Sequence, residues 1–376
     1  MADIPFNRPY MTGQELGNIT KAHQVGRLAG DGRFSKLCEK WLEDHTKCQR
    51  ALLTHSCTAA LEMAALLLDL QPKDEVIMPS YTFVSTANAF ALRGAVPVFV
   101  DIRPDTLNID ERLIEAAITP RTKAIVVVHY AGVACDMDAV TAIANKHGLS
   151  IIEDAAQAIM ASYKGRALGS IGDFGALSFH ETKNIQCGEG GALLINASPY
   201  RDAAEIIREK GTDRSRFFRG EVDKYTWQSL GSSYLPGELL AAFLYAQMHA
   251  AANITAERLR LWDHYHHLLA PLEVAGKLRR PFIPDYVTHS AHMYYILLPD
   301  DVVRLELIRQ LKASGIDAVT HYVPLHSSPA GKQLGRVDGE LMVTDDVAGR
   351  LLRLPLWMGL DAQEQDFIVS VIQKVL

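Results

Sequence analysis

Short apolar runs alternate with segments of helical spacing between residues 51 and 196. The runs richest in Val and Ile lie at residues 75–78, 96–100, 123–128 and 150–153. Runs that are apolar throughout are typical of strands covered on both faces, and the segments between them, such as 58–70 and 138–147, would form crossover helices. This pattern predicts an α/β domain with a mostly parallel central sheet.

The same periodicities continue to the end of the chain. The further elements that we expect are strands at 175–180, 191–196 and 293–298, and helices at 199–210, 236–252, 255–269, 302–313 and 363–376. A charged loop should span residues 211–224, between two of these helices. We therefore expect a large domain over residues 1–252, including an N-terminal segment, and a small α+β domain over residues 253–376.

The composition is that of a globular protein. Of 376 residues, 48% are hydrophobic and 22% are charged, which excludes wholesale disorder. A net charge of −6 argues against a nucleic-acid partner. The five cysteines include no CxxC pair, and neither a signal peptide nor an apolar stretch long enough to span a membrane is present. We expect a cytoplasmic protein without disulfides and without a membrane partner.

Ligands of open α/β sheets bind beyond the carboxyl ends of the strands, so polar residues after apolar runs are candidates. In segment 52–60 a strand passes directly into a helix at Ser56 to Thr58. The free amides of a helix start, together with small side chains, would suit a phosphate. Helix capping by Ser56 or Thr58 is the alternative explanation of the same residues.

Three further positions follow strands in the same way. Asp154 ends an apolar run, where a carboxylate needs a cation, either a structural Arg or Lys or a protonated ring nitrogen of a cofactor. Lys183 precedes a Gly-rich turn and is either a solvated lysine or an amine that forms a Schiff base. Tyr81 and Phe83 are either core residues or an aromatic platform for a planar ligand.

Taken together, these residues fit a single cofactor better than they fit a separate structural role for each of them. Pyridoxal phosphate needs an anchor for its phosphate, an aromatic side chain for its ring, an acid for its ring nitrogen and a lysine for its aldehyde. All four requirements are met at strand ends of one predicted sheet.

On these motifs the sequence resembles the sugar aminotransferases of the DegT/DnrJ/EryC1/StrS family, which are fold-type I pyridoxal-phosphate enzymes. Residues 56–58 fall where the family has its Ser-Gly-Thr phosphate loop, and residues 79–83 where its stacking aromatic lies. Residues 153–157 fall where it has the ring-nitrogen Asp, and residues 178–184 match its Schiff-base segment. The resemblance covers nearly the whole chain.

The resemblance implies a role for each of these residues. Lys183 would bond to the cofactor's aldehyde, Asp154 would face its ring nitrogen, Gln157 would bind its ring hydroxyl and Phe83 would stack on its ring. The phosphate ligands that it implies are the amides of Cys57 and Thr58 and the side chain of Ser178. Pyridoxamine phosphate would carry the amino group between the two halves of the reaction.

Two positions depart from the family pattern. Cys57 stands where the family often has Gly, which matters little if only its amide is used. The motif Gly-x-Asn-Tyr-Arg is Gly-Ser-Ser-Tyr-Leu at residues 231–235, so Ser233 replaces an Asn that reaches the phosphate of the other subunit. The resemblance also implies a homodimer with shared active sites.

The Gly-Ser-Ser-Tyr variant and residues 180–185 and 210–216 look most like one subfamily, the dTDP-4-amino-4,6-dideoxygalactose transaminases of enterobacterial common antigen assembly. That likeness implies L-glutamate as amino donor and dTDP-4-keto-6-deoxyglucose as acceptor. Candidate ligands of the nucleotide pyrophosphate are Arg214 and Arg216, and candidates for the sugar pocket are His180, His321 and His326. Each of these five could instead serve the surface or the core.

Other functions fit the residues to different degrees. A different nucleotide keto-sugar, with its ketone at C3 or linked to UDP, would use the same motifs. The family's 3-dehydratases have His in place of Lys183, and a regulator would need a basic DNA-binding extension. An amino-acid aminotransferase would use an Arg of the C-terminal domain, and no motif singles out one among Arg279, Arg280, Arg304, Arg309, Arg336, Arg350 and Arg353. The His-rich segment 264–267 has no metal-site pattern, and we expect no metal.

Overall fold

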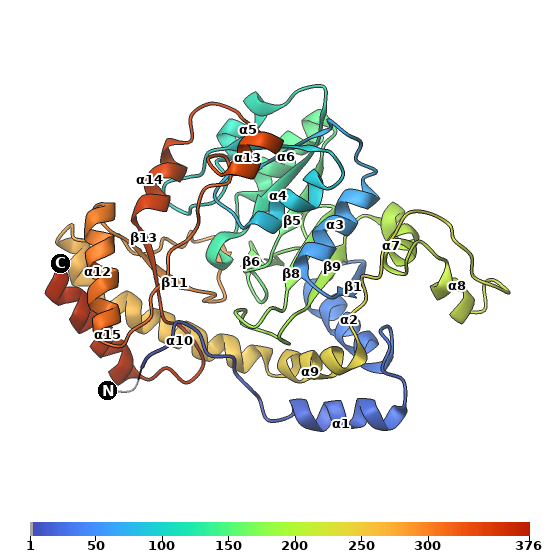
Figure 1. Cartoon of the computed structure of the whole chain (residues 1–376), viewed down its shortest axis with the longest axis horizontal. Helices are drawn as coiled ribbons and strands as arrows, with labels where there is room; N and C mark the ends of the chain where they lie inside the picture. The colour runs from blue at the N-terminus through green and yellow to red at the C-terminus, as the bar shows by residue number, and fades with distance from the viewer. Residues whose placement is uncertain (1–2) are drawn as a thin grey trace.

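A central sheet organises most of the chain (Figure 1). Its strands are β1 Arg50–Thr54, β2 Glu75–Pro79, β3 Val96–Val100, β4 Thr122–Val128, β5 Ser150–Asp154, β8 Phe174–Ser178, β9 Gly191–Ile195 and β12 Arg336–Val337. The computed structural model describes residues 3–376, and within them these eight strands follow the order β1-β9-β8-β5-β4-β2-β3-β12. Strand β9 pairs antiparallel with β1 and β8, and the other neighbours are parallel. The predicted α/β fold with a mostly parallel sheet is confirmed.

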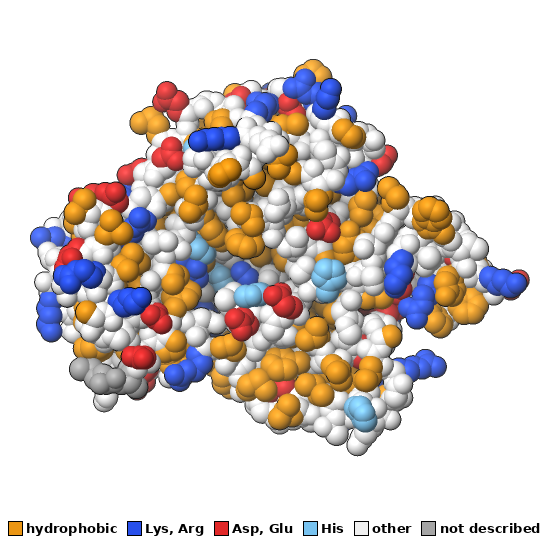
Figure 2. Space-filling view, viewed as in Figure 1, with side chains coloured by type: hydrophobic (Ala, Val, Ile, Leu, Met, Phe, Trp, Pro, Cys, Tyr) orange, Lys and Arg blue, Asp and Glu red, His pale blue; other side chains and the backbone are white. Residues whose placement is uncertain are grey.

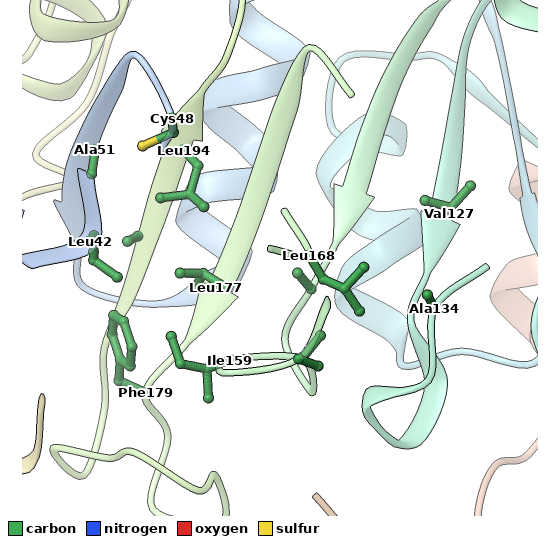
Figure 3. Close-up of a cluster of buried hydrophobic side chains, with 14 of the residues drawn as sticks. Leu42, Cys48, Ala51, Val127, Ala134, Ile159, Leu168, Leu177, Phe179 and Leu194 are labelled. Carbon is green, nitrogen blue, oxygen red and sulfur yellow. The ribbon is translucent and has the colours of Figure 1, made fainter. Parts of the chain in front are cut away.

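The apolar runs form strands because both faces of the sheet are buried. Along β8, Leu177 belongs to one hydrophobic core and Ala176 to a second. Along β9, Leu194 and Leu193 divide between the two cores in the same way. Alternate side chains of a strand point to opposite faces, so each core lies on its own side of the sheet. Figure 3 shows part of the first core, including Leu177 and Leu194.

Helices cover the two faces. They are α1 Glu15–Val25, α2 Arg33–Thr46, α3 Cys57–Leu67, α4 Val84–Ala91, α5 Glu111–Ala117, α6 Met137–His147, α7 Arg201–Arg208 and α9 Glu238–His249, with short 3-10 turns at Tyr130–Gly132 and Ser198–Tyr200. Side chains of α2, α5, α6 and α9 enter the first core, and those of α3, α4 and α7 enter the second. Most parallel strands are therefore joined by crossover helices, which places the carboxyl ends of β2, β4 and β5 at one edge of the sheet.

The C-terminal part of the chain builds a third core. Its elements are α10 Ala251–Leu268, α11 Ala270–Val274, β11 Tyr294–Leu297, α12 Asp301–Ala313, α13 Pro329–Leu334, α14 Met342–Arg350, β13 Leu351–Leu354 and α15 Ala362–Val375. Strands β11 and β13 pair antiparallel, and α10, α12 and α15 pack around them. A further small sheet joins β10 Val287–Thr288 to β6 Ser162–Tyr163 and β7 Arg166–Ala167.

Several contacts cross the predicted boundary between residues 252 and 253, including the pairing of β10 with β6. Ile4 lies in the C-terminal core and bridges to Ile316, and β12 extends the central sheet beside β3. The division of the chain into domains 1–252 and 253–376 stays a prediction.

Residues 211–224 differ from the loop that the sequence predicts. They contain a short helix, α8 Arg214–Phe218, in an arm that projects from the body of the molecule (Figure 1). Asp213 stabilises the base of this arm by accepting a hydrogen bond from the amide of Thr226, at 2.7 Å. No helix within residues 3–376 is long and apolar enough to cross a membrane.

Candidate active site

A cavity of about 580 Å³ lies at the carboxyl ends of the central strands. It brings together nine of the predicted site residues: Cys57, Thr58, Phe83, Asp154, Gln157, Ser178, His180, Lys183 and His321. They come from the start of α3, the segment after β2, the ends of β5 and β8, and the C-terminal unit. The face in Figure 2 is hollowed near its middle, where basic, acidic and histidine side chains lie close together.

The start of α3 forms one wall of the cavity. The side chain of Ser56 caps the helix by accepting a hydrogen bond from the amide of Ala59, at 3.1 Å. The amides of Cys57 and Thr58 precede any intrahelical partner and remain available to a ligand. Helix capping and a phosphate site, which the sequence leaves as alternatives, are therefore compatible. The start of α3 packs against the backbone of Gly191 in β9. A larger residue would not fit there, because a Cβ at position 191 would lie 2.5 Å from the Cys57 nitrogen.

Asp154 is a buried carboxylate at the end of β5. It accepts hydrogen bonds from the hydroxyl of Thr86, at 2.7 Å, and from the amide of Ala156, at 3.2 Å. Burial raises the pKa of Asp154, and these two donors oppose that effect. Within residues 3–376 no Arg or Lys forms an ion pair with this carboxylate, although the nearby charge of Lys183 also lowers its pKa. This arrangement favours a protonated ring nitrogen over a structural Arg or Lys as the partner of Asp154.

Glu153, the residue before Asp154, is also buried, and both of its carboxylate oxygens accept hydrogen bonds. Glu153 accepts from the amides of Gly169, Ile171 and Gly172, at 2.6–2.8 Å. His129 accepts from the amide of Cys135 through Nδ1, so its Nε2 carries the proton that is donated to Glu153, at 2.9 Å. This network fixes the end of β5 and hence the position of Asp154.

Lys183 lies in the loop after β8, and its amine faces the cavity. Burial lowers the pKa of Lys183 to about 8, and the nearby positive charge of Arg353 acts in the same direction. An amine with this pKa is partly unprotonated near neutral pH and can act as a nucleophile or a proton acceptor.

Gln157 and Phe83 line the cavity from two sides. The side-chain oxygen of Gln157 accepts from the amide of Ala131, at 2.7 Å, and its nitrogen donates to the hydroxyl of Tyr322, at 2.8 Å. Phe83 precedes α4 and is 56% exposed, so its ring is free to contact a ligand. Tyr81, by contrast, is a core residue, 1% exposed.

The histidines of the cavity are held by their neighbours. His180 Nδ1 accepts from the amide of Thr182, at 3.2 Å. His321 Nε2 accepts from Arg353, which leaves the ring proton on Nδ1, and its ring stacks on Tyr322 with centroids 3.8 Å apart. Burial and the Arg353 charge lower the pKa of His321 to about 2, so this imidazole is neutral.

Four predicted residues lie outside this cavity. Ser233 is exposed on the arm side of the molecule, where it bridges to Glu209. Arg214 donates to both oxygens of Glu209, at 3.1 and 3.2 Å, and Arg216 donates to Asp202, at 2.7 Å. His326 bonds to the hydroxyl of Ser80, at 2.8 Å, behind the cavity wall.

Sequence reasoning missed Thr86, Tyr322 and His292, and it left Arg353 as one of seven arginines that no motif singles out. Thr86 supports Asp154, Tyr322 holds Gln157, and His292 and Arg353 line the cavity. His292 and Arg353 had a detectable signal, since each is a polar residue beside an otherwise apolar strand, at Ala291–Leu298 and Leu351–Leu356. Nothing local distinguishes Thr86 or Tyr322, because their roles depend on contacts with distant segments.

The geometry agrees with comparisons with known proteins. Residues 9–373 match the model of the DegT/DnrJ/EryC1/StrS aminotransferase family. The chain belongs to this family. It is 33% identical to the spore coat polysaccharide biosynthesis protein SpsC of Bacillus subtilis, over 99% of this chain and 97% of that protein. It is 32% identical to the GDP-perosamine synthase of Caulobacter vibrioides, over 100% of both chains.

Solved structures of the same architecture extend over the whole chain. DesV of S. venezuelae superposes with a TM-score of 0.90 and 30% identity, covering 100% of this chain and 98% of that one. Spr1654 of Streptococcus pneumoniae has been solved in a PLP form, with a TM-score of 0.90, 28% identity and 100% coverage of both chains. The chain is a sugar aminotransferase that depends on pyridoxal 5'-phosphate (PLP).

The residues present fit this cofactor. The buried Asp154 carboxylate accepts hydrogen bonds from Thr86 and Ala156 and forms no ion pair within the described residues, so a protonated ring nitrogen would suit it. The unpaired amides at the start of α3 suit a phosphate, and the Lys183 amine faces the same cavity. When bound, the cofactor supplies an aldehyde for amines and a ring that withdraws electrons.

Proposed function

We propose that this aminotransferase moves the amino group of L-glutamate to C4 of dTDP-4-keto-6-deoxyglucose, giving dTDP-4-amino-4,6-dideoxygalactose. The observation that carries the proposal is the meeting of Lys183, Asp154 and the start of α3 in one cavity of a sugar aminotransferase. The choice of sugar rests on residues 180–185, 210–216 and 231–234, which look most like the subfamily with that substrate.

In this proposal Lys183 both binds the cofactor and carries a proton. Its lowered pKa lets the free amine accept a proton from Cα of the donor in the first half of the cycle and deliver a proton to C4 of the sugar in the second half. Asp154 would hold the ring nitrogen, oriented by Thr86 and Ala156. Loss of Lys183 would therefore remove turnover rather than only substrate binding.

The remaining cofactor contacts follow from the cavity walls. The amides of Cys57 and Thr58 and the hydroxyl of Ser178 would bind the phosphate. Phe83 would stack on the ring, and Gln157, already fixed by Ala131 and Tyr322, would face the ring hydroxyl. His180 and His321 line the space left for the sugar.

The proposed enzyme is a homodimer. Ser233, Arg214 and Arg216 lie away from the cavity of their own chain, as residues that serve the site of a second copy would. In that arrangement Ser233 would approach the partner's phosphate, and the two arginines would approach the nucleotide pyrophosphate. His326 would support the sugar pocket through Ser80 rather than contact the sugar.

The identity of the aminosugar product tests the proposed function. Purified enzyme with PLP, dTDP-4-keto-6-deoxyglucose and ¹⁵N-labelled L-glutamate should give one aminosugar, whose NMR spectrum shows the label on C4 with axial geometry. Parallel reactions with a 3-keto dTDP-sugar and with UDP- and GDP-linked 4-keto sugars test the other acceptors. A label on C3, an equatorial amine, or faster turnover of another nucleotide would contradict the assignment.

A further inference from the structure

His292 is a cavity histidine whose position is fixed through both its backbone and its side chain. The buried guanidinium of Arg258 donates to the carbonyl oxygen of His292, at 2.7 Å. Asn184, which follows Lys183 in the chain, donates through its side-chain nitrogen to the carbonyl oxygen of Ser290, at 2.7 Å. The side-chain oxygen of Asn184 lies 3.1 Å from Nδ1 of His292. These contacts hold the imidazole against the loop that carries Lys183.

The hydrogen bonds of Asn184 determine which nitrogen of His292 carries the proton. Because the Asn184 nitrogen donates to Ser290, its oxygen is the atom that faces His292, and an amide oxygen only accepts. Nδ1 of His292 is therefore protonated and donates to Asn184. Burial and the nearby charge of Lys183 lower the pKa of His292, so the ring is neutral and its Nε2 keeps a free lone pair.

This free nitrogen of His292 has no partner in the described part of the protein. His292 lines the cavity that holds Lys183, and within residues 3–376 no hydrogen bond involves its Nε2. The other cavity histidines use their unprotonated nitrogens on protein donors, His321 on Arg353 and His180 on a backbone amide. Among the histidines that line the cavity, His292 is therefore the one that offers it a hydrogen-bond acceptor.

The amine of Lys183 is a donor in the same cavity, and within residues 3–376 it makes no hydrogen bond or ion pair. An unprotonated amine has two N–H donors and one lone pair. To accept a proton from a carbon, that lone pair has to point at the carbon. A fixed acceptor beside the amine takes one N–H and so restricts the directions in which the lone pair can point.

We propose that His292 is the positioning residue of Lys183: its Nε2 accepts a hydrogen bond from the lysine amine while that amine is free of the cofactor, and aims it at the carbon that exchanges the proton. The proposal rests on the proposed role of Lys183 as proton carrier. No proton passes to His292, because the neutral ring only accepts the hydrogen bond and the amine alone gains and loses the proton. A protonated imidazole would have no lone pair to offer, and burial of the ring disfavours that form.

Nitrogen NMR of the cofactor-free enzyme tests this contact without any turnover. In protein labelled with ¹⁵N-histidine, we expect His292 to show a protonated Nδ1 and an unprotonated Nε2, and His292→Gln to identify these signals by their loss. Lys183→Met removes the donor, so the Nε2 signal of His292 should move to the position of an unbonded nitrogen. The signals of His267, an exposed histidine of α10, should stay unchanged. A protonated Nε2, or an Nε2 signal that does not respond to Lys183→Met, overturns the proposal.

Half-reaction kinetics separate positioning from a merely structural role. The PLP-loaded enzyme is mixed with L-glutamate, and conversion of the cofactor is followed by its absorbance. We expect His292→Leu to slow conversion by about 10- to 100-fold, while the glutamate concentration for half-saturation changes less than about threefold. The deuterium isotope effect with glutamate labelled at Cα should rise, because proton transfer becomes slower, whereas partial loss of fold or of cofactor would not raise it. His292→Gln, which keeps an acceptor, should recover part of the rate, and His267→Leu should match the wild type.

The outcomes distinguish this inference from the proposed function. If Lys183→Ala is inactive and His292→Leu converts glutamate at the wild-type rate, or is slower only because it binds glutamate more weakly, the positioning role is wrong and the proposed function stands. Conversion of glutamate by Lys183→Ala would contradict the proposed role of Lys183 itself. A wild type that does not convert glutamate would contradict the proposed donor, and the NMR experiment would still test the contact. If His292→Leu does not fold, His292→Gln and the NMR of the wild type decide.

Discussion

At the scale of single residues, the environment of the Lys183 amine differs from that of an exposed lysine. The desolvation of this half-buried side chain disfavours its protonated form and outweighs the opposing charge of Asp154, and the Arg353 charge acts with the desolvation. Its pKa falls from 10.5 to about 8, so the unprotonated fraction of the amine rises around pH 8 rather than around pH 10.5. The transfer of a proton to this amine should gain rate with increasing pH until about 8.

We expect this titration to be visible in the cofactor-free enzyme. After reductive methylation with ¹³C-formaldehyde, the Lys183 resonance should shift with a midpoint at about pH 8, whereas exposed lysines titrate above about 10. Lys183→Ala should remove this resonance, and Lys312→Ala, an exposed control on α12, should leave it. A midpoint near 10 for Lys183 would show that its amine is solvated.

Thr86 orients the carboxylate that faces the cofactor. Its hydroxyl proton is donated to Asp154, so the neighbouring Thr82 donates to Thr86, at 2.7 Å. In Thr86→Val the carboxylate loses a charge-assisted hydrogen bond, its pKa rises further, and it pairs less well with a protonated ring. PLP should then bind about 10-fold more weakly in a fluorescence titration, and Thr86→Ser should bind it normally. Equal affinity of the valine variant would exclude the positioning role.

At the scale of elements, α2 and α7 are joined by a buried ion network. Arg208 of α7 is fully buried and donates to Glu39 of α2 and to Asp31, at 2.7 Å for Asp31. Glu39 also accepts from the amide of Leu53 in β1, at 3.3 Å. The network therefore connects two helices with the strand that leads into α3.

Removing one partner of this network should be costly. Arg208→Met leaves the charge of Glu39 buried with fewer partners, and we expect it to lower the free energy of unfolding by about 3 to 5 kcal/mol. Adding Glu39→Gln should restore part of the loss, because the buried charge is then absent. Arg260→Met, which breaks an exposed pair with Glu257, should cost less than about 1 kcal/mol. Urea denaturation measures all three, and equal losses for Arg208→Met and Arg260→Met would refute the expectation.

At the scale of the whole molecule, the segment of residues 211–231, which includes the projecting arm with α8, exposes large apolar side chains. Phe218, Trp227 and Leu230 are 65%, 77% and 60% exposed. Large apolar side chains gathered on one exposed segment are typical of a protein–protein contact. The arm also carries Arg214 and Arg216 close to Ser233 in sequence, so the same contact would deliver the proposed cross-subunit ligands.

The dimer can be tested on this arm. Light scattering of the wild type should give twice 41.5 kDa, and the double variant Trp227→Asp with Leu230→Asp should give 41.5 kDa. Val302→Asp, an equally exposed position on α12, is the control and should remain dimeric. A monomeric wild type, or a double variant of unchanged mass, would contradict the proposed assembly.

Local pattern determined much of this molecule. The strands β2, β3, β4 and β5 follow from apolar runs that only a sheet covered on both faces can bury. Asp154 was predicted because it ends such a run, and Lys183 because it lies between the next strand and a Gly-rich turn. Parallel strands end at one edge of the sheet, which brings such residues together. The family motifs near these strands supplied the cofactor, which the comparisons bear out.

Tertiary packing determined which residues meet at the site, and the hydrophobic periodicity of the sequence does not specify this. Arg353 looks like any of seven arginines in the C-terminal part of the chain until β13 is placed beside the loop of Lys183. Thr86 supports Asp154 only because α4 packs against the end of β5. Ser233, Arg214 and Arg216 face away from their own cavity, since the arm carries them outward. Contacts between segments far apart in sequence depend on how whole elements pack, and the local order of residues does not specify that packing.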